Sequence, residues 1–513
     1  MIVHYYDDDT IPKNTTHLTF RDNFNQPINN LPNSITHLTF GYCFNQPIGN
    51  LPDSITHLTF GYAFNKPIKN LPDSITQLIF DNNFNQPIDN LPNSITQLTF
   101  GNNFNQPINN LPSLITHLTF GDNFNQPIGC LPKTIIQLSS NHKLKMLNLN
   151  KIVDNLPCSI KYLEIGKNFN QPLNNLPRSI THLTIGSKFS RCVDNLSDSI
   201  THLTFVENFN GSVDNLPDSI THLTFGLKFN QQIDYLPNSI TRLTFDRDFN
   251  QTIDNLPNSI KYLTFGKKFN QPVNNLPKSI THLTFGENFN QSVDNLPNSI
   301  THLEFGYYFN QSVDNLPHSI THLTFGYDFN KPVDYLPNSI THLTFESDFN
   351  QSVDNLPCSI THLTFGYDFN KPVDNLPCSI THLTFGYDFN RPIDNLPNSI
   401  TYLTLGNNFN QPINKIIDFV KVLCYISFNN YNKHKEKLTN KMVIYYGENT
   451  NYYKFNNYII GGFYDEIKQI ADLHYFIHEI LLKKLTEYVF NPQRLLRISE
   501  KYNLTIDEYI DFL

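Results

Sequence analysis

The apolar positions of this chain recur every twenty residues over most of its length. In the repeat at residues 31–50, LPNSITHLTFGYCFNQPIGN, the apolar side chains include Ile35, Leu38, Phe40, Phe44 and Ile48. Around Leu38 and Phe40 they alternate with polar residues, as in a half-exposed strand. The pattern predicts one short strand in each repeat, a return path that also carries apolar residues, and a core built from copies of the same side chains.

Ile35, Leu38 and Phe40 stand at relative positions 1, 4 and 6, the strand spacing of leucine-rich repeats. One repeat cannot fold alone, because burying six apolar side chains gains roughly 9 kcal/mol against about 1 to 2 kcal/mol of backbone ordering for each residue. Stacked copies bury both faces of every interior repeat. We therefore expect a mainly β solenoid: an open, leucine-rich-repeat-like stack of about twenty short repeats with a parallel inner sheet.

The repetition also defines the expected domain organisation. The repeats fill residues 11–415, with one degenerate repeat of 25 residues at 131–155. Residues 1–10 are expected to cap the N-terminal end with a strand, since an end repeat would otherwise expose its core. Residues 416–513 depart from the period and form the expected C-terminal cap and small α-rich module.

Several elements are predicted within this C-terminal segment. Apolar residues at helical spacing over 416–423 predict a helix that closes the core. Residues 442–446 and 458–460 predict two strands that can pair with each other. A long helix is expected over 464–489, and Asn491, followed by proline, is suited to begin another.

The composition limits the functions and the cellular location that we expect for this protein. The formal net charge is −9, which argues against a sequence-independent nucleic-acid binder, because such proteins need clustered Lys and Arg. The cysteines form no CxxC pair and no apolar stretch follows a basic N-terminus, so a cytoplasmic protein is expected. No run approaches the ~20 apolar residues of a membrane span. Cys358 and Cys378 share a place in successive repeats, which we interpret as chance recurrence rather than a disulfide.

The segments FNQPI at 24–28 and LPDSITHLTF at 51–60 recur throughout the repeats. They resemble the FNIP repeat, a family related to leucine-rich repeats and found largely in amoebae and in the large DNA viruses that infect them. The resemblance implies the cytoplasm of a host cell as one setting. Several family members carry an F-box ahead of the repeats, which implies a substrate adaptor of a ubiquitin ligase. Here ten residues precede the first repeat, so we expect no F-box in that place.

Histidine and threonine point out of the predicted sheet. The histidines of this column include His17, His37, His57, His282, His302, His322, His342, His362 and His382. Metal sites use a closed set of ligands with supporting partners rather than an open row, so we interpret the column as a solvated ladder and expect no bound metal. Because neighbouring imidazolium ions repel, we expect pKa values below the usual 6.5 or so.

The two positions after the strand glycine vary most between repeats, and in residues 296–395 they concentrate Tyr and Asp. Exposed aromatic residues are favoured in protein interfaces. The candidate partner-binding residues are His302, Tyr307, Tyr308, His322, Tyr327, His362, Tyr367, Asp368, His382 and Tyr387.

A second acidic column recurs from Asp294 to Asp394 at intervals of twenty. The glycine-rich pattern of calcium-binding β-helices is missing, so we interpret this column as a solvated face. His474 and His478 lie four residues apart on the predicted long helix, but no HExxH is present. Cys424 lacks the Cys-x-Asp of the ubiquitin ligases that end some bacterial leucine-rich-repeat effectors. We identify no catalytic residue and no cofactor, and expect a protein that is not an enzyme.

The preferred interpretation is a protein–protein interaction scaffold that binds its partner on the concave or rim surface of the solenoid. The first alternative is a substrate adaptor of a ubiquitin ligase, with the C-terminal segment replacing the F-box as the docking piece. The second is a structural repeat protein without a specific partner. In none of the three does the chain bind nucleic acid or a membrane.

Overall fold

The computed structural model contains two compact units, Met1–Asp246 (unit 1) and Arg247–Leu513 (unit 2). The residues that the structure describes are 2–5, 11–28, 30–121, 123–124, 126–140, 156–166, 169–425, 442–446, 451–455 and 458–462. The helices predicted from residue 464 onward lie outside them, as does most of the loop of the degenerate repeat.

Unit 1 is a parallel sheet to which each repeat adds one short strand. Its strands are β1 (Ile2–Tyr5), β2 (His17–Phe20), β3 (His37–Thr39), β4 (His57–Phe60), β5 (Gln77–Phe80), β6 (Gln97–Thr99), β7 (His117–Phe120), β8 (Gln137–Ser140), β9 (Tyr162–Ile165), β10 (His182–Ile185), β11 (His202–Phe205), β12 (His222–Phe225) and β13 (Arg242–Phe245). Equivalent residues pair, as His182 does with His202. Pairing stays in register across the degenerate repeat, where Leu138 lies opposite Leu163.

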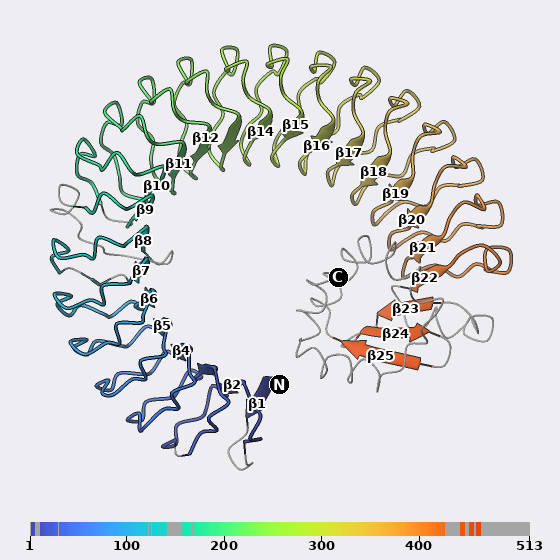
Figure 1. The fold of residues 1–513 in the computed structure, drawn as a ribbon. Coiled ribbons are helices and arrows are strands. Elements are labelled where there is room, and N and C mark those ends of the chain that lie inside the picture. The colour runs from blue at the N-terminus through green and yellow to red at the C-terminus, as the bar shows by residue number, and fades with distance from the viewer. Residues whose placement is uncertain are drawn as a thin grey trace. The chain divides into compact units, whose positions relative to one another are not determined.

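Unit 2 continues the same pattern and then departs from it. Its strands are β14 (Tyr262–Thr264), β15 (His282–Thr284), β16 (His302–Glu304), β17 (His322–Phe325), β18 (His342–Phe345), β19 (His362–Thr364), β20 (His382–Thr384), β21 (Tyr402–Leu405), β22 (Val422–Tyr425), β23 (Met442–Tyr446), β24 (Asn451–Phe455) and β25 (Tyr458–Gly462). Pairing is parallel from β14 to β23 and antiparallel from β23 through β24 to β25. Within each unit the strands follow one another along one side of the coil, and the return loops lie on the other (Figure 1).

The core consists of the side chains that recur every twenty residues. In the β18 repeat, Ile340, Leu343, Phe345 and Phe349 are each at most 1% exposed. The rings of Phe345 and Phe349 stack with centroids 3.7 Å apart, and each also stacks on its counterpart in the next repeat, at 5.8 and 6.0 Å. Burial of each such side chain contributes about 1.5 to 3 kcal/mol, so most of the stability lies in contacts between neighbouring repeats.

Polar side chains satisfy the backbone where the chain turns. The Asn350 N–H donates to the Asn330 Oδ1 atom at 3.0 Å, and the Ser359 hydroxyl donates to the Ile340 carbonyl at 2.6 Å. The same two bonds recur through both units, for example at Asn105 and Ser94. The side-chain oxygens of these asparagines therefore accept from loop backbone N–H groups that have no strand partner.

Residues 416–423 do not form the predicted helix. Residues 414–419 are turns, and β22 pairs in register with β21, Leu423 opposite Leu403. Ile416, Val420 and Leu423 are at most 2% exposed, so they do extend the core as expected. The β-branched residues suit a strand, and the open edge of β21 provides the partner that decides between the two structures. The strands predicted over 442–446 and 458–460 are present as β23 and β25, but they do not pair with each other. β24 lies between them and pairs with both.

We expect Phe349→Ala to lower the free energy of unfolding by roughly 3 to 5 kcal/mol, because it leaves a cavity between two neighbouring rings. Phe349→Leu keeps most of the volume and should cost clearly less. Urea unfolding followed by circular dichroism measures both. Equal, small effects of the two substitutions would show that the stacked phenylalanines do not carry the stability of the repeats.

Candidate functional site

The histidines of unit 2 form a continuous stack on the exposed face of the sheet. From β15 to β20, successive rings lie with centroids 4.2 to 4.3 Å apart and nearly parallel. Tyr402 extends the stack beyond His382 at 4.2 Å. We call His282, His302, His322, His342, His362 and His382 the imidazole column. Its side chains are half-buried against one another, so the expectation of a solvated ladder needs correction.

Each imidazole is oriented by the threonine that precedes it. The Thr321 Oγ1 and His322 Nδ1 atoms are 2.9 Å apart. The Thr301 carbonyl, which also lies within reach of the Thr321 hydroxyl, already accepts two backbone N–H groups, from Thr321 and His322. Because a carbonyl has two lone pairs, we assign the single hydroxyl proton to the bond with Nδ1. The neutral imidazole then carries its own proton on Nε2.

The pKa values of three histidines in this column are depressed. Burial, followed by the charge of neighbouring histidines, lowers the pKa of His322, His342 and His362 to about 4. Unit 1 holds a shorter column in which burial and then His182 and His222 lower the pKa of His202 to about 4. The direction expected from the sequence is confirmed, but burial contributes more than the repulsion proposed there. These imidazoles are neutral at pH 7.

Five exposed tyrosines lie beyond the ends of the strands. Tyr307 stacks on Tyr327 at 4.5 Å, and Tyr367 stacks on Tyr387 at 4.6 Å, both pairs within 3° of parallel. The four rings are 36–50% exposed, and Tyr308 packs edge-on against Tyr307. The stack ends at Tyr327 and resumes at Tyr367, because the repeat between them has serine in this place.

A row of aspartates accompanies the tyrosines. Asp328, Asp348, Asp368 and Asp388 occupy the next position of four successive repeats, and backbone bonds of 2.8 to 2.9 Å join each to the preceding repeat. Burial and then the Asp348 charge raise the pKa of Asp328; burial, Asp348 and Asp388 raise that of Asp368. We call these aspartates and the five tyrosines the tyrosine rim. At Asp328 and Asp368, burial and then the neighbouring carboxylates disfavour the charged form.

The predicted site residues thus fall into two separate columns. His302, His322, His362 and His382 belong to the imidazole column, and Tyr307, Tyr308, Tyr327, Tyr367, Asp368 and Tyr387 belong to the tyrosine rim. The columns lie five residues apart along the chain, so one extended partner can span both. Asp328, Asp348 and Asp388 were not among the predicted residues, although the Tyr-Asp pair recurring after the strand glycine indicates two of them.

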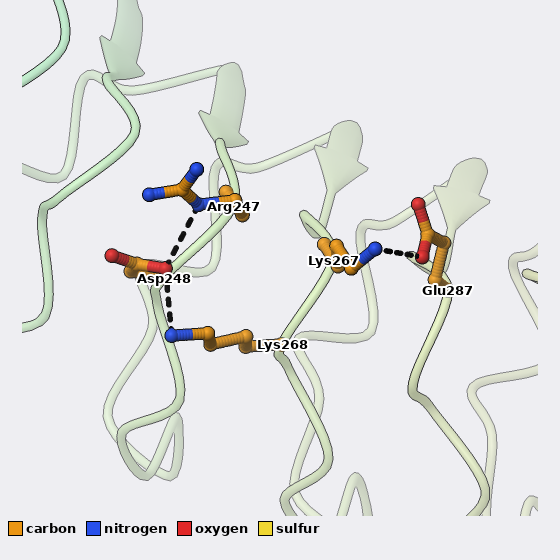
Figure 2. Close-up of polar contacts among 5 residues, drawn as sticks. All are labelled: Arg247, Asp248, Lys267, Lys268 and Glu287. Atoms are coloured by element: carbon orange, nitrogen blue, oxygen red, sulfur yellow. Dashed lines mark hydrogen bonds and ion pairs between the residues drawn. The ribbon is translucent and has the colours of Figure 1, made fainter.

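The same rim positions carry a different chemistry at the start of unit 2 (Figure 2). Asp248 accepts from Arg247 Nε at 3.1 Å and from Lys268 Nζ at 2.9 Å, while Lys267 Nζ lies 2.5 Å from Glu287. Exposed ion pairs of this kind contribute about 0 to 1 kcal/mol each. Along unit 2 the rim therefore changes from paired basic residues to exposed tyrosines and carboxylates.

Several aspartates of the column from Asp294 to Asp394 accept a hydrogen bond from an asparagine of the next repeat, which the sequence interpretation missed. Asp294 accepts from the Ser292 hydroxyl at 2.7 Å and from the Asn315 amide at 3.1 Å. These two bonds, the serine first, lower the pKa of Asp294. Among the described residues, no group of three His, Cys, Asp or Glu is placed to hold a metal ion. Cys358 and Cys378 are exposed thiols.

We expect NMR titration to give pKa values near 4 for His322, His342 and His362. Because folding lowers these values below the ordinary 6.5, the unfolded chain binds more protons, and stability is lost as the pH falls from about 6.5 toward 4. Chemical unfolding at pH 7, 5.5 and 4.5 measures the loss. Replacing the three by glutamine, as found at Gln77 and Gln97, should flatten the dependence; histidines titrating at or above 6.5 contradict this account.

Asn315→Ala should raise the pKa of Asp294 toward its ordinary 3.8, because the carboxylate loses the amide that favours its charged form. Carbon-detected NMR titration of the carboxyl group measures the change. Asn375→Ala removes the equivalent bond to Asp354 and serves as the matched control, leaving Asp294 as it was. An unchanged value in the first variant would mean that the amide does not hold the charged carboxylate.

The sequence of this chain matches a known family of repeats. The FNIP Repeat family model matches overlapping segments that cover residues 6–139, 148–188 and 193–419. A comparison with curated proteins finds no match. Among the described residues, no helix is long and apolar enough to cross a membrane.

Two solved structures resemble this chain. CroV588, a giant-virus protein whose crystal structure is described as a novel circular LRR protein structure, is 39% identical over 85% of this chain and 83% of its own, with a TM-score of 0.62. YopM from Yersinia enterocolitica WA-314 is 16% identical over 79% of this chain and 90% of its own, with a TM-score of 0.35. The family match along the repeats and the identity to CroV588 show that this chain belongs to the FNIP repeat family.

Proposed function

We propose that this protein is an interaction scaffold that binds a protein partner along the tyrosine rim and the adjoining imidazole column of unit 2. The observation that carries the proposal is the rim itself. Four tyrosine rings, 36–50% exposed, stand in two parallel stacks beside a row of carboxylates. Large aromatic side chains of this kind supply most of the binding energy in many protein interfaces.

The rim is organised before any partner arrives. Tyr307 and Tyr327 are held by their mutual stacking, and the backbone beneath them is bonded from repeat to repeat, as from Asp328 N–H to the Tyr307 carbonyl at 2.8 Å. A surface already in its bound arrangement loses little conformational entropy on association. Leucine-rich-repeat-like solenoids typically serve protein–protein interaction, and their extended faces suit a long partner segment.

The alternative function, a substrate adaptor of a ubiquitin ligase, depends on the C-terminal segment. There β23, β24 and β25 leave the parallel repeat pattern and form an antiparallel extension. In this alternative the rim binds the substrate and residues 416–513 bind the ligase. Affinity purification that recovers cullin-type components only when this segment is present favours the adaptor.

A rim variant tests the scaffold. Replacing Tyr307, Tyr327, Tyr367 and Tyr387 with alanine in the full chain should reduce saturable capture of a partner from host-cell extract at least about tenfold, since one interface hot spot is worth 2 kcal/mol or more. The matched control replaces Tyr42 and Tyr62, which stack at 4.5 Å in unit 1.

Quantitative mass spectrometry of captured proteins, repeated over a range of bait concentrations, measures the effect. Loss of the same partner in both variants, or the absence of any partner that saturates, overturns the proposal. The second result would favour a structural repeat protein without a specific partner.

A further inference from the structure

The tyrosine stack of the rim lacks one ring. Tyr307, Tyr327, Tyr367 and Tyr387 occupy one position of the repeat, and Ser347 occupies it in the repeat between the two stacked pairs. The backbone continues through this repeat without a break. Asp348 N–H donates to the Tyr327 carbonyl at 2.9 Å, and Asp368 N–H donates to the Ser347 carbonyl at 2.8 Å. The repeat therefore lacks the ring but keeps its backbone bonds, and it carries Glu346 where the flanking repeats carry Gly326 and Gly366.

We call the space between Tyr327 and Tyr367, above Ser347, the slot. Rings of adjacent repeats lie 4.5 to 4.6 Å apart where both are present. Tyr327 and Tyr367 are two repeats apart, so their facing surfaces are separated by about twice the strand spacing, roughly 9 to 10 Å between ring centres. A flat group midway would lie about 4.5 to 5 Å from each ring, within the range of aromatic stacking and of cation–π attraction.

The floor and the edge of the slot are polar. Ser347 is 7% exposed, and its hydroxyl makes no hydrogen bond with the residues that the structure describes. Asp348 follows it directly, and Asp328 and Asp368 stand one repeat away on either side. Burial, and after it repulsion by the Asp348 carboxylate, raise the pKa of Asp328 and of Asp368. A cation placed beside them would relieve this repulsion.

We propose that the slot between Tyr327 and Tyr367, above Ser347, binds the guanidinium group of an arginine carried by an extended segment of the partner. This inference rests on the proposed function and names the chemistry of the partner. The guanidinium is planar and permanently charged, stacks on aromatic faces and donates hydrogen bonds in its plane. It therefore matches the two rings, the serine hydroxyl and the carboxylates at once.

Other flat or charged groups match fewer of these features. A neutral aromatic ring fills the width of the slot but leaves the carboxylates without a counter-charge. The ammonium of lysine supplies the charge, but it is compact and strongly hydrated rather than flat. The stacked pair Tyr42 and Tyr62 in unit 1 is followed by Asn82, so a flat group there would meet a ring on one side only.

The test uses the full chain and a peptide labelled with carbon-13 and nitrogen-15 at its arginine, acetyl-Gly-Arg-Gly-amide, observed by NMR titration. Ring currents from two facing tyrosines should shift the arginine δ protons upfield. Replacing the arginine with citrulline, its neutral counterpart of the same shape, should weaken binding at least about tenfold, since a desolvated cation–π contact is worth about 2 kcal/mol. The lysine peptide should bind more weakly than the arginine peptide.

Ser347→Tyr inserts the ring that neighbouring repeats already accommodate, so the variant should fold, and it should abolish the upfield shift. Ser347→Ala keeps the slot open and is the matched control: it should keep the upfield shift, with binding weakened about two- to tenfold because one hydroxyl contact is lost. Asp348→Asn should weaken binding without removing the shift.

Equal binding of the arginine and citrulline peptides would overturn the proposal that the slot binds a guanidinium group. An unchanged upfield shift in Ser347→Tyr would overturn it as well. The proposed function is judged separately. If the rim variant loses its partner while the peptide does not bind, the rim is an interface but the slot is not an arginine site. If the peptide binds while no partner is captured, the slot stands as a site and the scaffold proposal fails.

Discussion

Within each unit, backbone hydrogen bonds join equivalent residues of neighbouring repeats, most of them twenty positions apart. The Thr361 N–H donates to the Thr341 carbonyl at 2.9 Å, and the Asp368 N–H donates to the Ser347 carbonyl at 2.8 Å. The first bond lies at the start of a strand and the second lies beyond its end. Both join equivalent positions of neighbouring repeats, so strand and rim share one spacing, close to 4.8 Å.

That spacing brings each side chain against a copy of itself, and the result depends on its chemistry. Phenylalanine rings stack and fill the core, as Phe349 does on Phe369. Asparagine amides bond to the backbone of the next repeat, as at Asn350. Ionised side chains placed next to copies of themselves repel one another. Burial and then neighbouring charges lower the pKa of His322, His342 and His362 and raise that of Asp328 and Asp368. Asp294 keeps its charge because serine and asparagine donate to it.

Departures from the repetition distinguish single places in these columns. A complete column satisfies itself, because each member is covered by its neighbours on both sides. Ser347 interrupts the tyrosine stack between Tyr327 and Tyr367 without interrupting the backbone bonds between repeats. The basic residues near Lys268 are a different departure, in which opposite charges pair within the chain.

The residue pattern was sufficient to determine the period, the strand in each repeat and the buried positions, because spacing along a regular coil decides which side chains face inward. It also located the tyrosine rim. It did not show that residues 422–425 extend the sheet, since that choice depends on the free edge of β21. Nor did it show how far the imidazoles are buried, or that Asn315 reaches Asp294 in the preceding repeat. The burial of the imidazoles and the reach of Asn315 to Asp294 depend on the distance between neighbouring repeats, which only the tertiary structure decides.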